Sequence, residues 1–206
     1  MAARSDIYAG GGVWLQNGGT VINEAGGEIL AEGGTGTAVF LGYGGAMAGP
    51  PSVDVINAGR IEAVSLEAGS ASMGIRLSSL GAREIVNSGT IKADIAILAD
   101  SYALEPPQKV TEIVTNLAGG LIIGAIELQL GDDQVVNRGI IRGNLLMDEG
   151  NDIVDTEGGA IEGVVFMGWG DDAFLGGAGN DVARGDRGSD RLSGEGGSHL
   201  LLGGQG

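Results

Sequence analysis

The sequence GGAGNDVARGDRGSDRLS, residues 176–193, consists of two consecutive nine-residue units that share one pattern. Each unit begins with a glycine-rich turn, carries an aspartate at its sixth position (Asp181 and Asp190) and ends in a three-residue segment with an apolar centre. Glycine tolerates the sharp bends of a turn, and a short segment with one inward side chain suits a β-strand. A regular repeat of this length predicts a solenoid, in which stacked coils bury a continuous core.

The same turn recurs along the C-terminal third of the chain as a Gly-x-Asp-x-apolar motif. Successive copies start 19, 20, 9, 9 and 9 residues apart, and His199 replaces the aspartate in the last copy. A single copy would be interpreted as an ordinary Asx turn, whereas copies in register favour a shared role. The copies occupy residues 131–135, 150–154, 170–174, 179–183, 188–192 and 197–201, and residues 167–175 fit the nine-residue frame with methionine in the first position.

A second repeat, two apolar residues and an asparagine followed by glycine and isoleucine, precedes the acidic turns. Its asparagines at positions 57, 87, 116 and 137 are spaced by 30, 29 and 21 residues. We expect these asparagines to form a structural ladder that satisfies turn backbone groups, with a ligand role as the alternative. A further apolar segment precedes each unit, so one coil should contain two or three short strands. The copies lie at 21–29, 55–61, 85–91, 114–122 and 135–141, and another has Thr156 in the asparagine position.

The connections between these segments change at residue 131. Earlier connections are long, at residues 42–53, 78–84 and 99–112, whereas later ones shrink to the Gly-x-Asp turns. The sequence therefore predicts two regions. Residues 1–130 should form irregular β-coils with Asn/Gly turns and long loops, and residues 131–206 should form the acidic coils.

Composition limits the function classes. The net charge of −16 opposes binding to nucleic-acid phosphates and favours a cation as partner. The absence of cysteine excludes a disulfide framework and a thiolate metal site. No apolar run reaches the roughly 18 residues of a membrane span, and residues 1–12 lack the features of a cleavable signal peptide.

The nonapeptides at 167–202 resemble the RTX, or hemolysin-type, calcium-binding repeat, and a diluted form of the pattern reaches back to residue 131. The N-terminal coils more weakly resemble Asn-Gly-Ile solenoid units found beside such repeats in large bacterial surface proteins. The resemblance implies an all-β fold, a right-handed parallel β-helix that passes into a calcium-binding parallel β-roll. It also implies secretion, by the type I route, to the cell exterior. Residues 203–206 match the first four positions of another nonapeptide, so we expect a chain truncated at its C-terminus.

In that family two nonapeptides complete one coil, which assigns the acidic residues to columns. A step of 18–20 residues is then a full coil, and a step of nine crosses to the opposite side. Asp133, Asp152, Asp172 and Asp190 should form one column, with Asp181 and His199 in the other.

Calcium requires six to eight oxygen ligands, more than a single turn supplies, so two stacked turns would share each ion. We expect ions between residues 133 and 152, 152 and 172, and 172 and 190. The Asp181–His199 pair is the weakest candidate because neutral imidazole is a poor calcium ligand. The predicted calcium-binding residues are Asp133, Asp152, Asp172, Asp181, Asp190, Gly170, Gly176, Gly177, Gly179, Gly185 and Gly188.

The charge of the acidic region supports a counterion. Residues 131–206 contain ten aspartates and four glutamates against five arginines. Carboxylates stacked about 4.8 Å apart repel each other by about 3 kcal/mol per contact at an effective dielectric constant of ~20. We therefore expect this region to be largely disordered without calcium and to fold with it, since metal binding energy becomes folding energy.

The leading hypothesis is a noncatalytic calcium-binding module of a secreted bacterial protein. The alternatives are a β-helix polysaccharide lyase or epimerase with RTX modules, and an adhesin; a cell-surface or polysaccharide partner stays open. The sequence contains neither a His-Glu-x-x-His nor a Gly-x-Ser-x-Gly motif. The polar residues that follow two of the asparagine turns suit a solvated face: Arg60, Glu62, Lys92 and Asp94.

Two further features have ordinary interpretations. In the pairs Asp132-Asp133 and Asp171-Asp172, the second aspartate holds the motif position, so the first should face solvent. Trp14 is expected to be a packing or surface residue, as is Trp169, rather than a sugar-binding platform.

Overall fold

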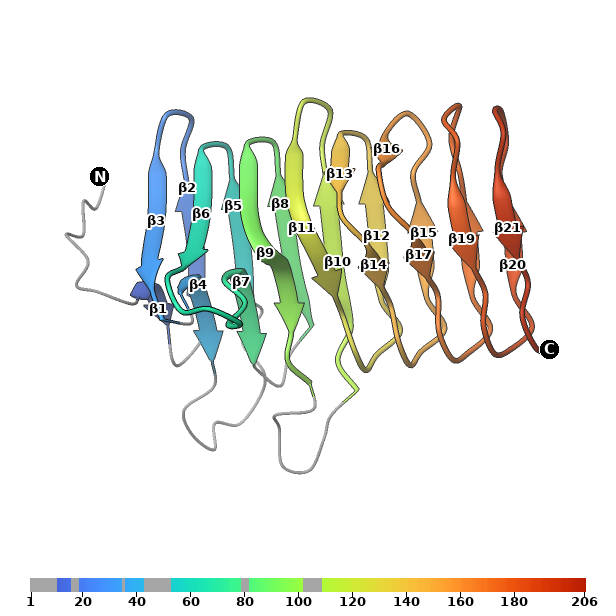
Figure 1. Ribbon diagram of the computed structural model, residues 1–206, viewed down its shortest axis with the longest axis horizontal. Helices are drawn as coiled ribbons and strands as arrows, with labels where there is room; N and C mark the ends of the chain where they lie inside the picture. Colours follow the sequence, from blue (N-terminus) through green and yellow to red (C-terminus); the bar gives the residue numbers. More distant parts are fainter. Residues whose placement is uncertain (1–10, 16–18, 35, 43–52, 79–81, 102–108) are drawn as a thin grey trace.

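The computed structural model describes residues 11–206, except for 16–18, 35, 43–52, 79–81 and 102–108. The chain winds into an elongated stack of coils, with β1 at one end and β21 at the other (Figure 1). All strand pairs between described residues are parallel, and no helix occurs among these residues. The predicted all-β parallel solenoid is therefore confirmed. The three long connections predicted before residue 131 lie partly outside the described residues, which omit 43–52, 79–81 and 102–108.

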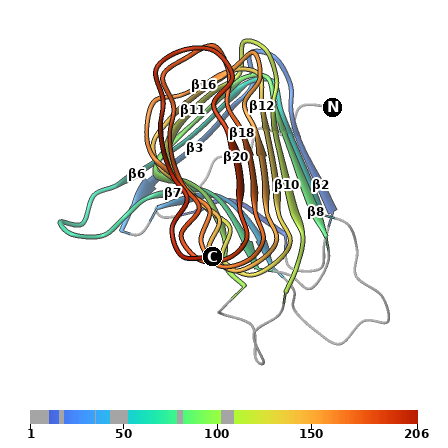
Figure 2. The ribbon, with the colours of Figure 1, turned by 90° about the vertical axis from the view of Figure 1, so that its right-hand side faces the viewer.

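The strands form two sheets that run along the stack, and the coils superimpose when viewed along it (Figure 2). One sheet follows the order β2-β5-β8-β10-β12-β15-β18-β20, and the other follows β1-β4-β7-β9-β11-β14-β17-β19-β21, with β3, β6, β13 and β16 paired beside this path. The strands are β1 (Gly11–Leu15), β2 (Gly19–Asn23), β3 (Glu28–Gly33), β4 (Thr37–Gly42), β5 (Val53–Asn57), β6 (Arg60–Ser65), β7 (Met73–Ser78), β8 (Arg83–Asn87), β9 (Thr90–Ala99), β10 (Glu112–Asn116), β11 (Leu121–Glu127), β12 (Gln134–Asn137), β13 (Ile140–Arg142), β14 (Leu145–Leu146), β15 (Ile153–Asp155), β16 (Ala160–Ile161), β17 (Val165–Phe166), β18 (Ala173–Leu175), β19 (Val182–Arg184), β20 (Arg191–Ser193) and β21 (Leu200–Leu202).

The core is a column of aliphatic side chains between the sheets. Each short strand contributes one inward residue, because successive side chains of a strand point to opposite faces. Phe174, at the centre of β18, is buried, and Leu192, at the centre of β20, packs against the same core. The buried series includes Val55, Ile85, Val114, Val135 and Val154 from one sheet and Ile75, Ile97, Ile126, Leu145 and Val165 from the other.

The coils become simpler towards the C-terminus. The long strand β9 pairs with two strands of the preceding coil, β6 and β7, and with β11 of the next coil. Strand β11 in turn pairs with two shorter strands of the coil after it, β13 and β14. From β18 to β21 each strand has three residues, and successive strands start at nine-residue intervals. The nonapeptides therefore form half-coils of one turn and one short strand, as the repeat predicts.

The asparagines form the predicted ladder through the interior of the stack. The Nδ2 of Asn57 donates to the Oδ1 of Asn87 at 2.8 Å, and Asn87 donates in the same way to Asn116. The ladder extends to Asn23 at one end and, through Asn137, to the hydroxyl of Thr156 at the other. These side chains also donate to turn carbonyls, so the structural interpretation is confirmed.

Candidate functional site

Four aspartates line up at the turns that lead into one sheet. Strands β12, β15, β18 and β20 pair in register, which stacks the residue before each strand on its neighbours. The backbone N–H of Asp133 donates to the Oδ1 of Asp152 at 2.8 Å, and that of Asp152 donates to Asp172 at 2.8 Å. The N–H of Asp172 donates to Asp190 at 3.1 Å. The predicted column is therefore present, and we call these four residues the acid ladder.

One oxygen of every acid-ladder carboxylate lacks a partner. The Oδ1 atoms of Asp152, Asp172 and Asp190 accept the N–H groups just described, whereas the Oδ2 atoms of all four residues are buried without a hydrogen bond. A buried charged oxygen without a partner destabilises the folded state strongly. The acid ladder thus presents a row of oxygens that require either protons or cations.

Three carboxyl groups of the acid ladder have raised pKa values. Burial, as the largest cause, raises the pKa of Asp152 to about 8. Burial likewise raises the pKa of Asp133 and of Asp172 to about 6 each. Neighbouring carboxylates add to the shift, since Asp133 and Asp172 both disfavour the charged form of Asp152. Without a cation, Asp152 of the folded ladder therefore retains its proton near neutral pH.

The glycine turns leave room for oxygens of two successive coils to converge. A Cβ atom added to Gly185 would lie 2.2 Å from the Oδ2 of Asp190 and 2.5 Å from the backbone oxygen of Gly203. At Gly176 it would lie 2.6 Å from the Oδ2 of Asp181 and 2.8 Å from the oxygen of Gly194. Any side chain at these positions would therefore displace a carboxylate or a carbonyl of the next coil.

The other predicted glycines play different parts. Gly188 stacks on Gly170, and both have positive φ values, 132° and 140°. The N–H of Gly177 donates to the Oδ2 of Asp181 at 3.2 Å. A Cβ atom at Gly179 would meet no atom within 4 Å, so space does not require a glycine there. In four turns a residue other than glycine takes the second position of the repeat and has a positive φ: Gln129, Asp148, Asp186 and Glu195.

Asp181 and His199 form the predicted second column on the opposite side. The N–H of Asp181 donates to the Nδ1 of His199 at 3.2 Å, so the imidazole takes the place that a carboxylate holds in the acid ladder. The same Nδ1 lies 3.1 Å from the Oδ2 of Asp181. This column therefore offers one carboxylate, which already accepts a hydrogen bond.

The first aspartate of each pair lies at the surface, as predicted. Asp132 accepts the N–H of Asn151, whose Oδ1 accepts the N–H of Asp171. Asp171 in turn accepts the N–H of Ser189 at 2.8 Å. We call Asp132, Asn151 and Asp171 the outer row. It is exposed, in contrast to the acid ladder behind it, and each of its members accepts one backbone N–H of the next coil.

Two charged residues that the sequence analysis did not select extend the column towards the N-terminus. The N–H of Glu112 donates to the Oδ1 of Asp133 at 2.7 Å, and Glu112 pairs in register with Arg83. The Nη1 of Arg83 lies 3.0 Å from the Oε1 of Glu112, and both side chains are buried. A signal was present, because each residue stands four positions before a ladder asparagine, as Asp133 does before Asn137.

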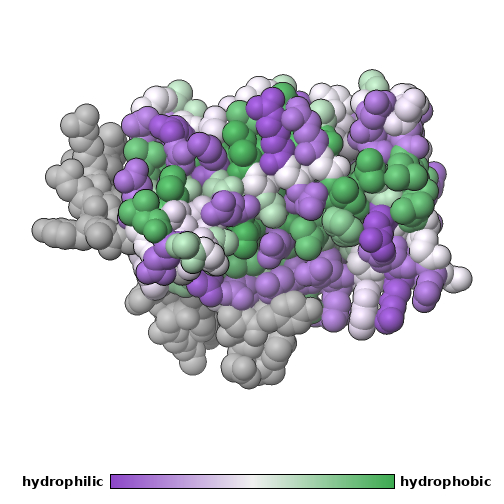
Figure 3. Space-filling view, viewed as in Figure 1, coloured by the Kyte–Doolittle hydropathy of each residue, from purple (hydrophilic) through white to green (hydrophobic). Residues whose placement is uncertain are grey.

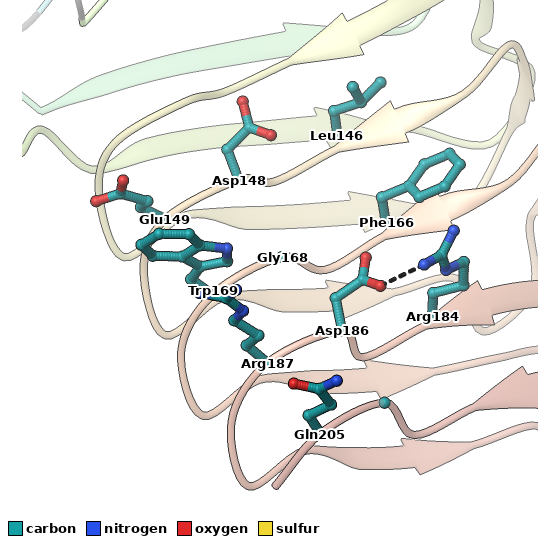
Figure 4. A pocket seen from close by; sticks show the side chains of 11 residues that line it. Leu146, Asp148, Glu149, Phe166, Gly168, Trp169, Arg184, Asp186, Arg187 and Gln205 are labelled. Carbon is teal, nitrogen blue, oxygen red and sulfur yellow. Dashed lines mark hydrogen bonds and ion pairs between the residues drawn. The ribbon is translucent and has the colours of Figure 1, made fainter.

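A groove of about 760 Å³ runs outside the same coils, and Figure 4 shows its lining. The guanidinium of Arg187 lies 4.7 Å from the ring centre of Trp169, and that of Arg184 lies 5.4 Å from the ring of Phe166. Arg184 also pairs with Asp186 at 2.7 Å. One face of each ring is thus covered by an arginine of the next coil, which favours packing over a sugar platform.

Polar and apolar residues are interspersed over the face shown in Figure 3.

Of the four polar residues that follow two of the asparagine turns, Arg60, Lys92 and Asp94 are exposed, as expected, whereas Glu62 is buried. Glu62 accepts hydrogen bonds from Arg60 and, at 2.8 Å, from Lys92, and Asp94 accepts hydrogen bonds from Ser72. Among the described residues, no three His, Cys, Asp or Glu side chains converge on one point to hold a metal. The acid ladder is instead a linear array, and each consecutive pair of its residues offers two carboxylates. Two carboxylates are too few ligands for a calcium ion, so backbone oxygens would have to complete the coordination.

Within the described ranges, no helix is long and apolar enough to cross a membrane. Comparison with family models, curated proteins and solved structures gave no match for this chain.

Proposed function

We propose that the chain is a calcium-binding solenoid of the RTX type, a structural module of a secreted bacterial protein. The supporting observation is the row of buried, unpartnered Oδ2 atoms on Asp133, Asp152, Asp172 and Asp190. Calcium matches this row because it takes oxygen ligands in a tolerant geometry and neutralises neighbouring carboxylates. The residues that would hold three ions are the carboxylates of successive acid-ladder members, together with backbone oxygens of the glycine turns.

The binding would act as a folding switch. Burial raises the pKa values of Asp133, Asp152 and Asp172, so the charged forms of these three carboxylates are disfavoured in the folded state, and each bound ion would offset that cost by attraction. Cytosolic calcium is scarce, so the acidic coils would stay unfolded inside the cell. Extracellular calcium would fold them after export, which suits passage through the narrow channel of type I secretion. The role is structural, and we assign no catalytic residues.

The test is a calcium titration of the full chain in metal-free buffer at pH 7.5. We expect about three ions per chain by isothermal titration calorimetry, a gain of far-UV β signal and a rise in melting temperature. Magnesium at the same concentration should do much less, because it demands near-ideal octahedral geometry and dehydrates reluctantly. Identical melting curves with chelator and with calcium would refute the proposal.

A further inference from the structure

The column that carries the acid ladder contains one built-in cation. Along the first residues of β5, β8 and β10, the register pairs Val53 with Arg83 and Arg83 with Glu112. Glu112 then continues into the acid ladder through its hydrogen bond to Asp133. The column therefore reads, from the N-terminal side, as an apolar residue, an arginine and five successive acidic residues.

Arg83 is buried as deeply as the carboxylates. Its side chain is 0% exposed and that of Glu112 is 1% exposed, with 3.0 Å between the Nη1 and Oε1 atoms. The guanidinium also interacts favourably with the charge of Asp133, one coil further on. Arginine suits such a position because its delocalised charge is more weakly hydrated than an ammonium group. The step from Glu112 to Asp133 thus has a positive charge that the later steps lack.

We infer that Arg83 serves as the cation of the Glu112–Asp133 step, in the place of the ion that later steps would take from solution. The inference rests on the proposed calcium binding. It divides the four acid-to-acid steps of the column into one that has a cation within the chain and three that would need calcium. The first coil of the acidic region would then form without calcium, whereas the coils after Asp133 would depend on it.

The test compares Arg83→Met, which keeps an unbranched apolar side chain but removes the charge, with Arg142→Met. Arg142 is a suitable control because it also pairs with a glutamate of a neighbouring coil, Glu162, at the surface. Calorimetry should give one more calcium ion per chain for Arg83→Met than for the wild type, and an unchanged number for Arg142→Met. In calcium-free buffer Arg83→Met should melt well below the wild type, and saturating calcium should close most of that gap.

An unchanged number of ions in folded Arg83→Met, with the same melting deficit with and without calcium, would overturn the inference. If Arg83→Met does not fold even in calcium, Glu112→Gln decides the question. That variant should bind as many ions as the wild type, because Glu112 faces Arg83 rather than calcium, and the loss of one ion would overturn the inference. If the wild type itself bound no calcium, the proposed function would fail, an outcome distinct from these two.

Discussion

Asp172 donates its backbone N–H to the Oδ1 of Asp190 at 3.1 Å, and the second carboxylate oxygen of each residue is buried without a partner. This relationship joins two residues that are 18 positions apart in the chain and one coil apart in the stack. It satisfies the backbone of one coil and leaves an oxygen of each coil available. The acid ladder thereby separates a structural role, carried by Oδ1, from a binding role, which we propose for Oδ2.

The first prediction compares substitutions of two adjacent aspartates, the buried Asp172 and the exposed Asp171. Asp172→Asn retains the Oδ1 acceptor but removes the charge, so it should abolish calcium binding at the two steps that share residue 172. Calorimetry should then give about one ion per chain in place of three. Without calcium at pH 7.5 the variant should be at least as stable as the wild type, because a buried charge is gone.

Asp171→Asn is the matched control, because Asp171 belongs to the exposed outer row. It should keep the wild-type number of ions and the wild-type gain in stability. That gain is about 2.7 kcal/mol per site at a calcium concentration of 100 times the dissociation constant. Equal losses in the two variants would argue against the separate roles of the acid ladder and the outer row.

The second prediction concerns pH in the absence of calcium. The pKa of Asp152 in the folded state is raised to about 8, and those of Asp133 and Asp172 to about 6, from the ordinary aspartate value of 3.8. The folded state therefore binds more protons than the unfolded state between pH 4 and 8, so stability falls as pH rises through this window. Each unit of pKa difference corresponds to about 1.4 kcal/mol.

Urea unfolding in metal-free buffer at pH 4.5, 6 and 7.5 measures this effect. Two carboxyl groups, Asp94 and Asp155, have lowered pKa values, and their contributions are lost below about pH 4, outside the window. Saturating calcium should reverse most of the fall, because the acid ladder is then occupied by ions at neutral pH. Stability that rises from pH 4.5 to 7.5 without calcium would contradict the prediction.

The third prediction uses two glycines of the repeat. Gly185→Ala places a methyl group 2.2 Å from the Oδ2 of Asp190 and 2.5 Å from the oxygen of Gly203. It should weaken calcium binding at the adjacent step at least tenfold and lower the melting temperature in calcium. Gly179→Ala, which meets no atom within 4 Å, should leave both quantities nearly unchanged. Similar effects of the two substitutions would show that backbone freedom, and not space for oxygens, explains the glycines.

The fourth prediction concerns the asparagine ladder. Asn87→Ala removes a buried amide that donates to Asn116 and accepts from Asn57, so each neighbour loses one hydrogen bond of the ladder. The free energy of unfolding should fall by about 2–3 kcal/mol, equally with and without calcium. Ser88→Ala, at an exposed position of the same turn, should change it by less than about 0.5 kcal/mol. A calcium-dependent loss for Asn87→Ala would mean that the two ladders are not independent.

Much of this architecture follows from the sequence, because a solenoid repeats local geometry. The nine-residue step predicted half-coils that correspond to β18, β19, β20 and β21. The intervals near 19 residues placed the aspartates in one column, since each interval equals the length of one coil. Arg83 and Glu112 were missed because long connections separate them from the acidic repeat and hide their register. The buried Oδ2 atoms also required coordinates, since exposure depends on how closely adjacent coils pack.

The asparagine and acid ladders overlap in only two coils, those of Asn137 with Asp133 and of Thr156 with Asp152. The neutral ladder joins the N-terminal coils by hydrogen bonds between uncharged side chains, and its last member lies beside the first steps for which we propose an ion. Because each coil of a solenoid contacts only its neighbours, growth of the structure depends on the rung already formed. The N-terminal coils would therefore be a nucleus that is folded without ions, and the acidic coils would fold onto it one after another, towards the C-terminus, as ions bind.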